Sequence, residues 1–182
     1  MGRIIAVANQ KGGVGKSTTA INLSACLAEK GKKVAIDIDP QGNTTSGLGV
    51  DKNTVENTLY ELLLGQADAK STIVKNVVEN LDLIPSNVNL SGAEIELIGV
   101  DDKEYILKRI TDKIRRKYDY IIMDCPPSLN MLTINALTAA TSVLVPIQCE
   151  YYALEGLSQL IHTIDLVKER LNKRLVMEGV VF

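Results

Sequence analysis

The 182-residue chain contains no tryptophan, one phenylalanine and one histidine, and aromatic residues make up only 4% of it. Few rings are therefore present to stack on nucleic-acid bases. The chain also lacks an apolar run of the roughly 18 residues that a membrane-spanning helix needs. Residues 1–7 lack the cationic start and the long apolar core of a signal peptide. We expect a cytoplasmic protein without a membrane segment.

Cysteine is scarce as well, because Cys26, Cys125 and Cys149 are isolated and form no Cys-x-x-Cys pair. This spacing argues against a disulfide framework and against a zinc or iron–sulfur site. We expect all three to be reduced thiols in the core. His162 has no nucleophile or acidic residue at motif spacing, so we expect a surface or packing role for it.

The charge is nearly balanced, with 20 basic and 22 acidic residues giving a net charge of −2, and 46% of the residues are hydrophobic. Such a composition supports one sizeable core, and we expect a single domain over residues 1–182. It gives no overall footprint for nucleic acid, so DNA binding would need a local surface. The basic cluster of Lys113, Arg115, Arg116 and Lys117 ends a predicted helix, where the helix dipole favours cations in any case.

Short apolar segments alternate with helical patterns along the chain, which predicts an α/β fold with a mostly parallel sheet and helices on both faces. The predicted strands, which lack polar alternation and so suit burial on both faces, are Ile4–Ala8, Val34–Ile38, Leu81–Ile84, Tyr120–Met123, Ser142–Pro146 and Leu175–Phe182. The main predicted helices are Ser17–Lys30, Lys103–Lys117 and Ala153–Leu171. Because the sequence stops within an apolar strand pattern, we expect the C-terminal part of the domain to be missing.

A glycine-rich loop follows the first predicted strand and leads directly into a helix. Its glycines allow backbone N–H groups to surround phosphate oxygens, and the helix N-terminus adds positive potential. Lys16 would neutralise the β- and γ-phosphates, and Ser17 would offer a hydroxyl to Mg²⁺. Gln10 stands where a general P-loop has its first glycine, and a second lysine, Lys11, follows it. The expected nucleotide-binding residues are Lys11, Gly12, Gly13, Val14, Gly15, Lys16, Ser17 and Thr18.

Acidic residues lie at the ends of two predicted strands. Asp37 and Asp39 are two positions apart, so their side chains project in one direction at the sheet edge where open α/β folds bind ligands. Asp124 ends the apolar segment 120–123, which is the Walker B pattern that holds Mg²⁺. The polar segment 40–58 that follows Asp39 is long for a structureless connection and is typical of a functional loop. We expect Ser17, Asp37 and Asp124 to form the Mg²⁺ site.

This loop resembles that of the deviant Walker A ATPases, the family that includes ParA, Soj and MinD. The resemblance covers nearly the whole chain, and its later segments look like the chromosomal ParA (Soj) branch. It extends through Asp-Ile-Asp-Pro-Gln-Gly-Asn (37–43), Asp-Cys-Pro-Pro-Ser-Leu (124–129) and Gln-Cys-Glu-Tyr-Tyr-Ala-Leu-Glu-Gly (148–156). It implies a P-loop NTPase-like three-layer fold and Mg²⁺-dependent hydrolysis of ATP. It also implies catalytic roles for Lys16, for Lys11, which would reach the partner protomer's nucleotide, and for Asp39, which would position water with support from Asp37.

The resemblance implies a biological role in chromosome or plasmid partitioning. The ATP-bound protein would be a homodimer that coats nucleoid DNA nonspecifically, and a ParB-like (Spo0J-like) partner would stimulate its hydrolysis. In the family, the adenine pocket and the DNA-binding surface come from segments beyond the strand that ends at Phe182. We therefore expect the 182-residue form to keep phosphate and Mg²⁺ binding but to bind ATP weakly and DNA barely.

Two positions depart from the family's pattern. Only residues 34–36 separate Lys33 from Asp37, where relatives commonly have one more apolar residue, and a one-residue change alters strand register. We expect the difference to be absorbed near Lys33. Asn130 stands where relatives often have glycine, and asparagine tolerates the left-handed conformation.

Three other functions stay open. A MinD-type membrane-associated ATPase would need a C-terminal amphipathic helix, which these residues lack. An iron–sulfur carrier of the same fold would need a pair of bridging cysteines. A non-hydrolysing nucleotide-binding adaptor fits every motif except Asp39, and a phosphate-release assay separates it from an ATPase.

Overall fold

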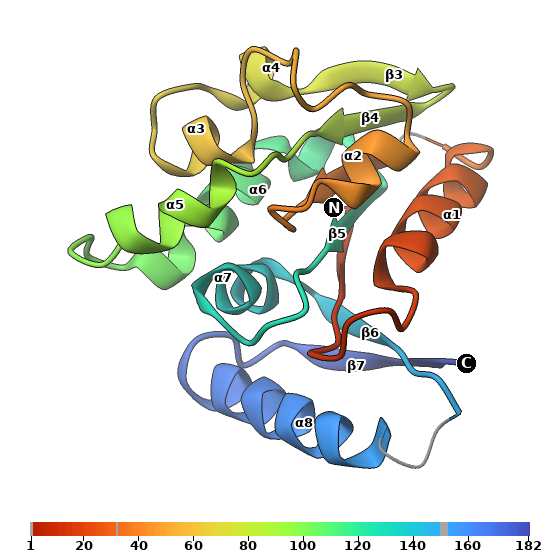
Figure 1. Cartoon of the computed structure of the whole chain (residues 1–182), viewed down its shortest axis with the longest axis vertical. Coiled ribbons are helices and arrows are strands. Elements are labelled where there is room, and N and C mark those ends of the chain that lie inside the picture. The colour runs from red at the N-terminus through yellow and green to blue at the C-terminus, as the bar shows by residue number, and fades with distance from the viewer. Residues whose placement is uncertain (1, 32, 150–152) are drawn as a thin grey trace.

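The structure, a computed structural model, describes residues 2–31, 33–149 and 153–182. Within these ranges the chain forms a seven-stranded sheet in the order β3-β4-β2-β5-β1-β6-β7 (Figure 1). Neighbouring strands run parallel except for β3, which pairs with β4 in the antiparallel direction. The predicted α/β fold is confirmed. The strands are β1 (Arg3–Val7), β2 (Lys33–Asp37), β3 (Val74–Val78), β4 (Leu81–Ile84), β5 (Tyr120–Asp124), β6 (Ser142–Pro146) and β7 (Val176–Val181).

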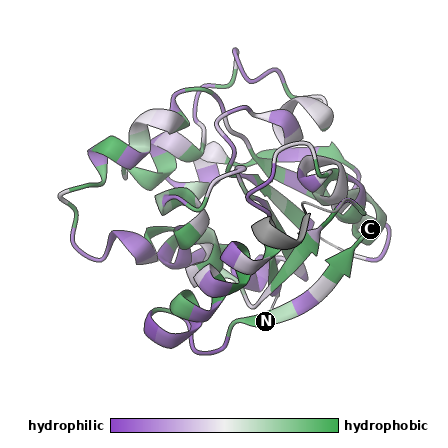
Figure 2. Cartoon of the chain, turned by 60° about the horizontal axis from the view of Figure 1, so that its bottom comes forward, coloured by the Kyte–Doolittle hydropathy of each residue, from purple (hydrophilic) through white to green (hydrophobic). Residues whose placement is uncertain are grey.

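Helices pack on both faces of the sheet (Figure 1). The helices α1 (Lys16–Ala28) and α2 (Asn43–Gly47) lie on one face of the sheet. On the other face, the larger hydrophobic core lies between the sheet and the remaining long helices. Figure 2 shows the hydrophobic residues gathered in the central strands. The other helices are α3 (Leu59–Leu63), α4 (Ala69–Thr72), α5 (Leu90–Glu96), α6 (Ile106–Ile114), α7 (Met131–Ala139) and α8 (Ala153–Arg170), with 3₁₀ turns η1 (Lys103–Tyr105) and η2 (Arg115–Lys117) next to α6.

The central strands are apolar on both sides, as predicted. In β1, Ile4 and Ala6 belong to the larger core, whereas Ile5 and Val7 pack with α1 on the opposite face. This is the burial that a parallel strand between two helical layers requires. β7 does not follow this rule: five of its six residues are exposed, and the exposed fraction of Val176 is 51%. The expectation that the last strand is buried on both faces was wrong for the residues described.

The sequence prediction missed β3, the strand at the other edge. β3 shows a register shift between its first and last residues, and Asn76 within it has a left-handed φ of 50°. Its side chains are exposed or half-buried, so no continuous apolar segment marks it. Lys75 Nζ lies 2.8 Å from the Asp82 carboxylate of β4, and Tyr118 Oη donates to that same carboxylate at 2.6 Å. Polar contacts across the sheet edge therefore hold β3 in place.

The shortened strand before Asp37 keeps its register. β2 begins at Lys33, which pairs with Leu81 of β4 and Tyr120 of β5, and the pairing with β5 continues unbroken to Asp37. Only 1% of the Lys33 surface is exposed, and its Nζ lies 3.4 Å from an Asp119 carboxylate oxygen. A lysine thus occupies a buried position at the start of the strand, and its ammonium group reaches an exposed carboxylate.

Two of the three cysteines are not in the core. Cys125 is fully buried, but Cys26 and Cys149 are exposed, so the prediction of three core thiols was wrong for those two. His162 lies on the exposed surface of α8. Residues 150–152 of the 148–156 motif lie outside the described ranges. None of the helices in the described part of the chain has the length and hydropathy of a membrane-crossing segment.

Candidate active site

The glycine-rich loop connects β1 to α1 at the carboxyl edge of the sheet. Gly15 precedes the helix with a left-handed φ of 89°, a conformation in which a side chain is strained, and this turn directs the chain into α1. Asn9 fixes the start of the loop: its amide donates to the Pro146 carbonyl at 2.8 Å, and its side-chain oxygen accepts the Lys11 N–H at 3.0 Å. The Gln148 amide donates to the Gly13 carbonyl at 3.0 Å. Strand β6 and the residues after it therefore support the loop from one side.

The loop borders a cleft of about 370 Å³. Residues that the sequence places far apart meet there, because the loop, the segment after β2 and the segment after β5 all follow parallel strands at one edge of the sheet. Lys11 and the buried Val14 are predicted nucleotide-binding residues that do not line the cleft. The lining residues are Gly12, Gly13, Gly15, Lys16, Ser17, Thr18, Asp39, Gln41, Asn43 and Pro127.

Lys16 is a buried cation at the first position of α1, with 7% of its surface exposed. Its Nζ donates to the main-chain carbonyl of Lys11 at 2.9 Å. Burial lowers the pKa of Lys16, and the carboxylates of Asp124 and Asp39 oppose this shift. A positive group held in this way between the loop and two acids is placed to neutralise phosphate oxygens in the cleft.

Asp124 ends β5 as a buried carboxylate that is only partly hydrogen-bonded. Its Oδ2 accepts the Thr44 hydroxyl at 2.7 Å, whereas its Oδ1 accepts no hydrogen bond from the described residues. Burial raises the pKa of Asp124, while the hydroxyls of Ser17 and Thr44 stabilise its ionised form. A buried carboxylate oxygen without a partner beside a serine hydroxyl is a donor set that fits Mg²⁺, which prefers oxygen ligands.

Asp37, which the sequence analysis expects in the Mg²⁺ site, is held by hydrogen bonds within the protein. It is fully buried at the end of β2, and both of its oxygens are occupied. Oδ1 accepts the Asp39 N–H at 3.2 Å, and Oδ2 accepts both the N–H and the hydroxyl of Thr45 at 2.7 Å. Each oxygen therefore has a protein partner, in contrast to Asp124 Oδ1, and the metal role of Asp37 stays a prediction. The contacts make Asp37 the attachment point of α2.

Asp39 lines the cleft across from the phosphate loop, and 6% of its surface is exposed. Its carboxylate Oδ1 accepts the Gln41 N–H at 2.9 Å, and its main-chain carbonyl accepts the Ser86 hydroxyl at 2.8 Å. The carboxylate is therefore oriented by its own loop and by a second segment of the chain.

Three buried hydroxyl residues of this region were missed by the sequence analysis: Thr44, Thr45 and Ser86. The two threonines follow Gly42-Asn43, within the polar segment 40–58 that the sequence marks as functional. Their hydroxyl side chains suit contacts with carboxylates, so the segment carried a usable signal. Ser86 carried none, because it lies 47 residues from the Asp39 carbonyl that it contacts.

Asn130 and Cys125 also lie in the segment after β5. Asn130 has an extended backbone (φ −89°, ψ −172°) and caps α7 by accepting the Thr133 N–H, so it does not need the left-handed conformation that its family position suggested. Cys125 is fully buried, as predicted for a core residue, and this burial raises the pKa of its thiol.

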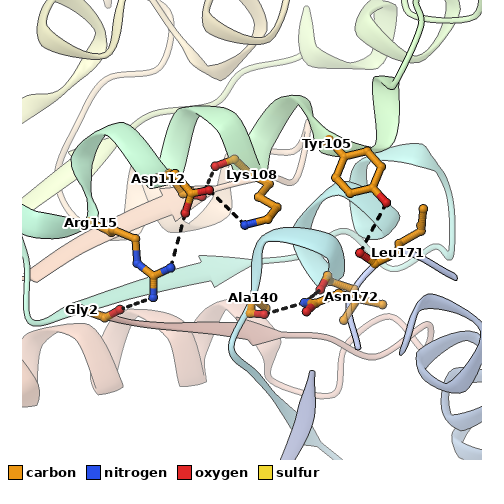
Figure 3. Close-up of polar contacts among 10 residues, drawn as sticks. Gly2, Tyr105, Lys108, Asp112, Arg115, Ala140, Leu171 and Asn172 are labelled. Carbon is orange, nitrogen blue, oxygen red and sulfur yellow. Dashed lines mark hydrogen bonds and ion pairs between the residues drawn. The ribbon is translucent and has the colours of Figure 1, made fainter. Parts of the chain in front are cut away.

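The basic cluster at the end of α6 is partly used for structure. Arg115 donates to the Gly2 carbonyl at 3.1 Å, and its other terminal nitrogen lies 3.4 Å from the Asp112 carboxylate (Figure 3). Asp112 also pairs with Lys108 at 3.0 Å. Arg115 therefore ties the end of α6 to the start of β1, while Arg116 and Lys117 are exposed.

Comparison with known proteins agrees with this geometry. Residues 2–177 match a family described as an AAA domain. The chain is 59% identical over 181 residues to the sporulation initiation inhibitor protein Soj of Bacillus subtilis, covering 99% of this chain and 72% of that protein. It is 52% identical over 181 residues to the chromosome partitioning protein ParA of Myxococcus xanthus, covering 99% of this chain and 64% of that protein.

A solved structure gives the same fold. The crystal structure of cobyrinic acid a,c-diamide synthase from Mycobacterium smegmatis, with bound ATP analogue and magnesium, superposes with a TM-score of 0.95 and 42% sequence identity. The match covers 100% of this chain and 74% of that one. The P-loop NTPase-like fold expected from the resemblance is therefore confirmed. Together with the identities above, it shows that this chain belongs to the ParA/Soj family of P-loop partition ATPases.

Proposed function

We propose that this protein is a Mg²⁺-dependent ATPase that dimerises on binding ATP and hydrolyses it to ADP and phosphate. One observation carries the proposal: the phosphate loop and the segment after β2 enclose a single cleft, with Lys16 and Ser17 on one side and Asp39 on the other. A buried cation, a hydroxyl and a carboxylate in this arrangement suit phosphoryl transfer to water, which depends on positioning and charge stabilisation.

Each residue has a distinct role in this proposal. The N–H groups of the loop and the N-terminus of α1 would bind the phosphates, and Lys16 would neutralise their charge. Ser17 and Asp124 would hold Mg²⁺, which supplies Lewis-acid polarisation of the phosphoryl oxygens when it is bound. Asp39 would orient the attacking water. Asp37, whose oxygens are both occupied by the protein, would hold the segment that carries Asp39 rather than contact the metal.

Lys11 and Gly12 support the dimer. Lys11 does not line the cleft of its own chain, although it stands at the start of the phosphate loop. Gly12 is exposed, and a Cβ built on it would meet no atom within 4 Å. This leaves room for the backbone of a second copy, whose nucleotide Lys11 would then reach.

The biological role we propose is chromosome or plasmid partitioning. It rests on the names of the relatives, Soj and ParA. The finer parts of this role, namely control by a ParB-like partner, nonspecific DNA binding and association with the nucleoid, are proposals on the same basis. We also propose that residues 1–182 act as one P-loop domain, since one core cluster runs from Ile4 to Leu175.

Sedimentation velocity with ADP, ATP and a non-hydrolysable ATP analogue tests the switch, and phosphate release in the same samples tests the chemistry. We expect a monomer with ADP, a dimer with either triphosphate and phosphate release only with ATP and Mg²⁺. A dimer without phosphate release would favour the non-hydrolysing adaptor. A nucleotide-independent monomer would contradict the proposed dimerisation.

A further inference from the structure

We propose that Ser86 and Thr45 are positioning residues for Asp39, acting through a closed ring of buried hydrogen bonds. The inference rests on the proposed hydrolysis and adds to it the group that fixes the water-orienting carboxylate. Ser86 and Thr45 are both fully buried, and neither lines the cleft. They would therefore act on the reaction only through the residues that they hold.

The ring joins three separate parts of the chain. The Asp39 N–H donates to Asp37 Oδ1 at 3.2 Å, and the Asp39 carbonyl accepts the Ser86 hydroxyl at 2.8 Å. The Ser86 N–H donates to the Thr45 hydroxyl oxygen at 2.9 Å, and this hydroxyl donates to Asp37 Oδ2 at 2.7 Å. Both main-chain polar groups of Asp39 are thus fixed by buried partners, and the Gln41 N–H fixes its carboxylate.

The sheet explains why Ser86 lies beside Asp39. The parallel strands β2 and β4 pair Ile36 with Ile84, so residues two or three positions further along each strand come out next to each other. Gly42 then turns the chain back with a left-handed φ of 63°, and a Cβ there would lie 2.8 Å from the Ser86 carbonyl oxygen. This close approach brings Thr45 of α2 over Ser86 and closes the ring.

A ring of this kind preorganises a catalytic group. When the main-chain N–H and C=O of a residue are both held, adopting the geometry in which its carboxylate orients water costs less free energy. Removal of one member should displace Asp39 while leaving the phosphate loop and Lys16 in place. The expected signature is a lower kcat with an unchanged KM, because the lost interaction matters in the transition state rather than in ground-state binding.

The test uses three variants and a matched control. Ser86→Ala removes one of the two donors to the Asp39 carbonyl, the other being the Gly42 N–H at 2.9 Å. Thr45→Val removes the ring hydroxyl while keeping the shape, and Thr45→Ser keeps the hydroxyl and removes a methyl. Ser71→Ala is the control, because the Ser71 hydroxyl also donates to a main-chain carbonyl, that of Asp68 at 3.0 Å, but is exposed on α4. Thermal melting checks that each variant is folded.

We expect kcat for phosphate release to fall about tenfold in Ser86→Ala and Thr45→Val, with KM for ATP within about twofold of wild type. Thr45→Ser and Ser71→Ala should keep the wild-type kcat. Equal losses in Thr45→Val and Thr45→Ser would indicate a packing role and overturn the proposal, as would a raised KM with unchanged kcat in Ser86→Ala.

Hydrogen exchange at the Asp39 amide gives a readout that does not depend on turnover. Its exchange should speed up in Ser86→Ala and Thr45→Val relative to Thr45→Ser, since the ring that protects it is opened. If wild-type protein releases no phosphate, the proposed hydrolysis fails, yet the exchange measurement still decides whether the ring holds Asp39. Unchanged exchange in all variants would overturn the inference.

Discussion

Asp37 lies directly beside Asp124 in the sheet, because the two residues end β2 and β5 and are paired in the parallel register. Each carboxylate accepts a hydrogen bond from one of two consecutive threonines of α2. The Thr45 hydroxyl donates to Asp37 and the Thr44 hydroxyl donates to Asp124, both at 2.7 Å. The short helix therefore bridges two buried carboxylates. In the proposed function Asp124 would hold Mg²⁺, and Asp37 would hold the helix.

The titration of Asp37 should appear in the pH dependence of stability. Burial raises the pKa of Asp37 from 3.8 to about 7, with the Asp124 charge adding to the shift and hydrogen bonds from Thr45 opposing it. Between these two values the folded protein binds a proton that the unfolded chain has released. Stability from this group is thus complete below about pH 4 and is lost as the pH rises through about 7.

Asp37→Asn removes this titration. Urea unfolding of metal-free and nucleotide-free protein at pH 5, 6 and 7 should show wild-type stability falling with pH by up to about 1.4 kcal/mol per pH unit more than that of the variant. Parallel stability curves for the two proteins would show that Asp37 is ionised throughout this range and would contradict the prediction.

Lys16→Met should weaken the binding of ATP by this chain. A charge-assisted hydrogen bond contributes on the order of 1.5–3 kcal/mol, so the Kd should rise at least about tenfold. The nucleotide-free protein should be no less stable than wild type, because burial disfavours the charged form of Lys16. Titration with a fluorescent ATP analogue measures the affinity. Lys30→Met, at an exposed position after the far end of α1, is the control. Wild-type affinity for ATP in Lys16→Met would contradict the assignment of this loop as the phosphate-binding loop.

Gly12→Val should block dimerisation without harming the monomer. A Cβ at Gly12 meets no atom within 4 Å of its own chain, so the fold has room for the change. Because Gly12 also lines the cleft, the loss is assigned to the second copy only if the variant still binds the ATP analogue. Gly99→Val is a matched control, since Gly99 is exposed and equally open. Lys11→Ala should behave like Gly12→Val, because the Lys11 carbonyl that accepts the Lys16 ammonium belongs to the main chain and is kept in the variant. Sedimentation velocity with the ATP analogue measures dimerisation of each variant. An ATP-dependent dimer in either variant would refute the cross-subunit arrangement.

Asp39→Asn should bind ATP and dimerise but hydrolyse slowly. The amide oxygen still accepts the Gln41 N–H, so the loop conformation is kept while the charge proposed to orient water is lost. We expect phosphate release to fall by about a hundredfold, in the range of lost general-base catalysis. Asp101→Asn, at an exposed position after α5, should release phosphate at the wild-type rate. If Asp39→Asn does so too, another group must orient the water.

The strands at the centre of the sheet could be predicted from the sequence, because a segment buried between two helical layers is mostly apolar, with Asp82 and Ser142 as buried polar exceptions. Leu81–Ile84 and Ser142–Pro146 agree with the structure at both ends. The phosphate loop was predictable because its function depends on consecutive residues. β3 was not, since its half-exposed side chains and its bulge give no apolar signal and its contacts are polar.

The supporting contacts of the site were hidden for a different reason. Ser86 meets Asp39 only because two parallel strands end side by side, and strand order is a property of the assembled sheet rather than of either segment. The contacts of Asp37 were hidden in the same way. A carboxylate at a strand end is compatible with a metal, and only the positions of α2 and Thr45 show that its oxygens are occupied.

The last prediction concerns β7, the edge strand on the α8 side of the sheet. Within the described ranges it pairs only with β6, and its outer residues are apolar and exposed, including Met177 at 43% and Val181 at 39%. Unpaired backbone groups next to exposed apolar side chains promote edge-to-edge association. The 182-residue chain should therefore self-associate at high concentration without nucleotide.

Val181→Lys should reduce this association, because a charge on an edge strand opposes strand pairing between molecules. Ile98→Lys is the control: Ile98 is 67% exposed but lies after α5, away from the sheet edge, so the same change of charge there should have no effect. Sedimentation equilibrium without ATP separates this association from the proposed ATP-dependent dimer, which would need the phosphate-loop face. If both lysine variants lower association equally, overall charge rather than the β7 edge governs it.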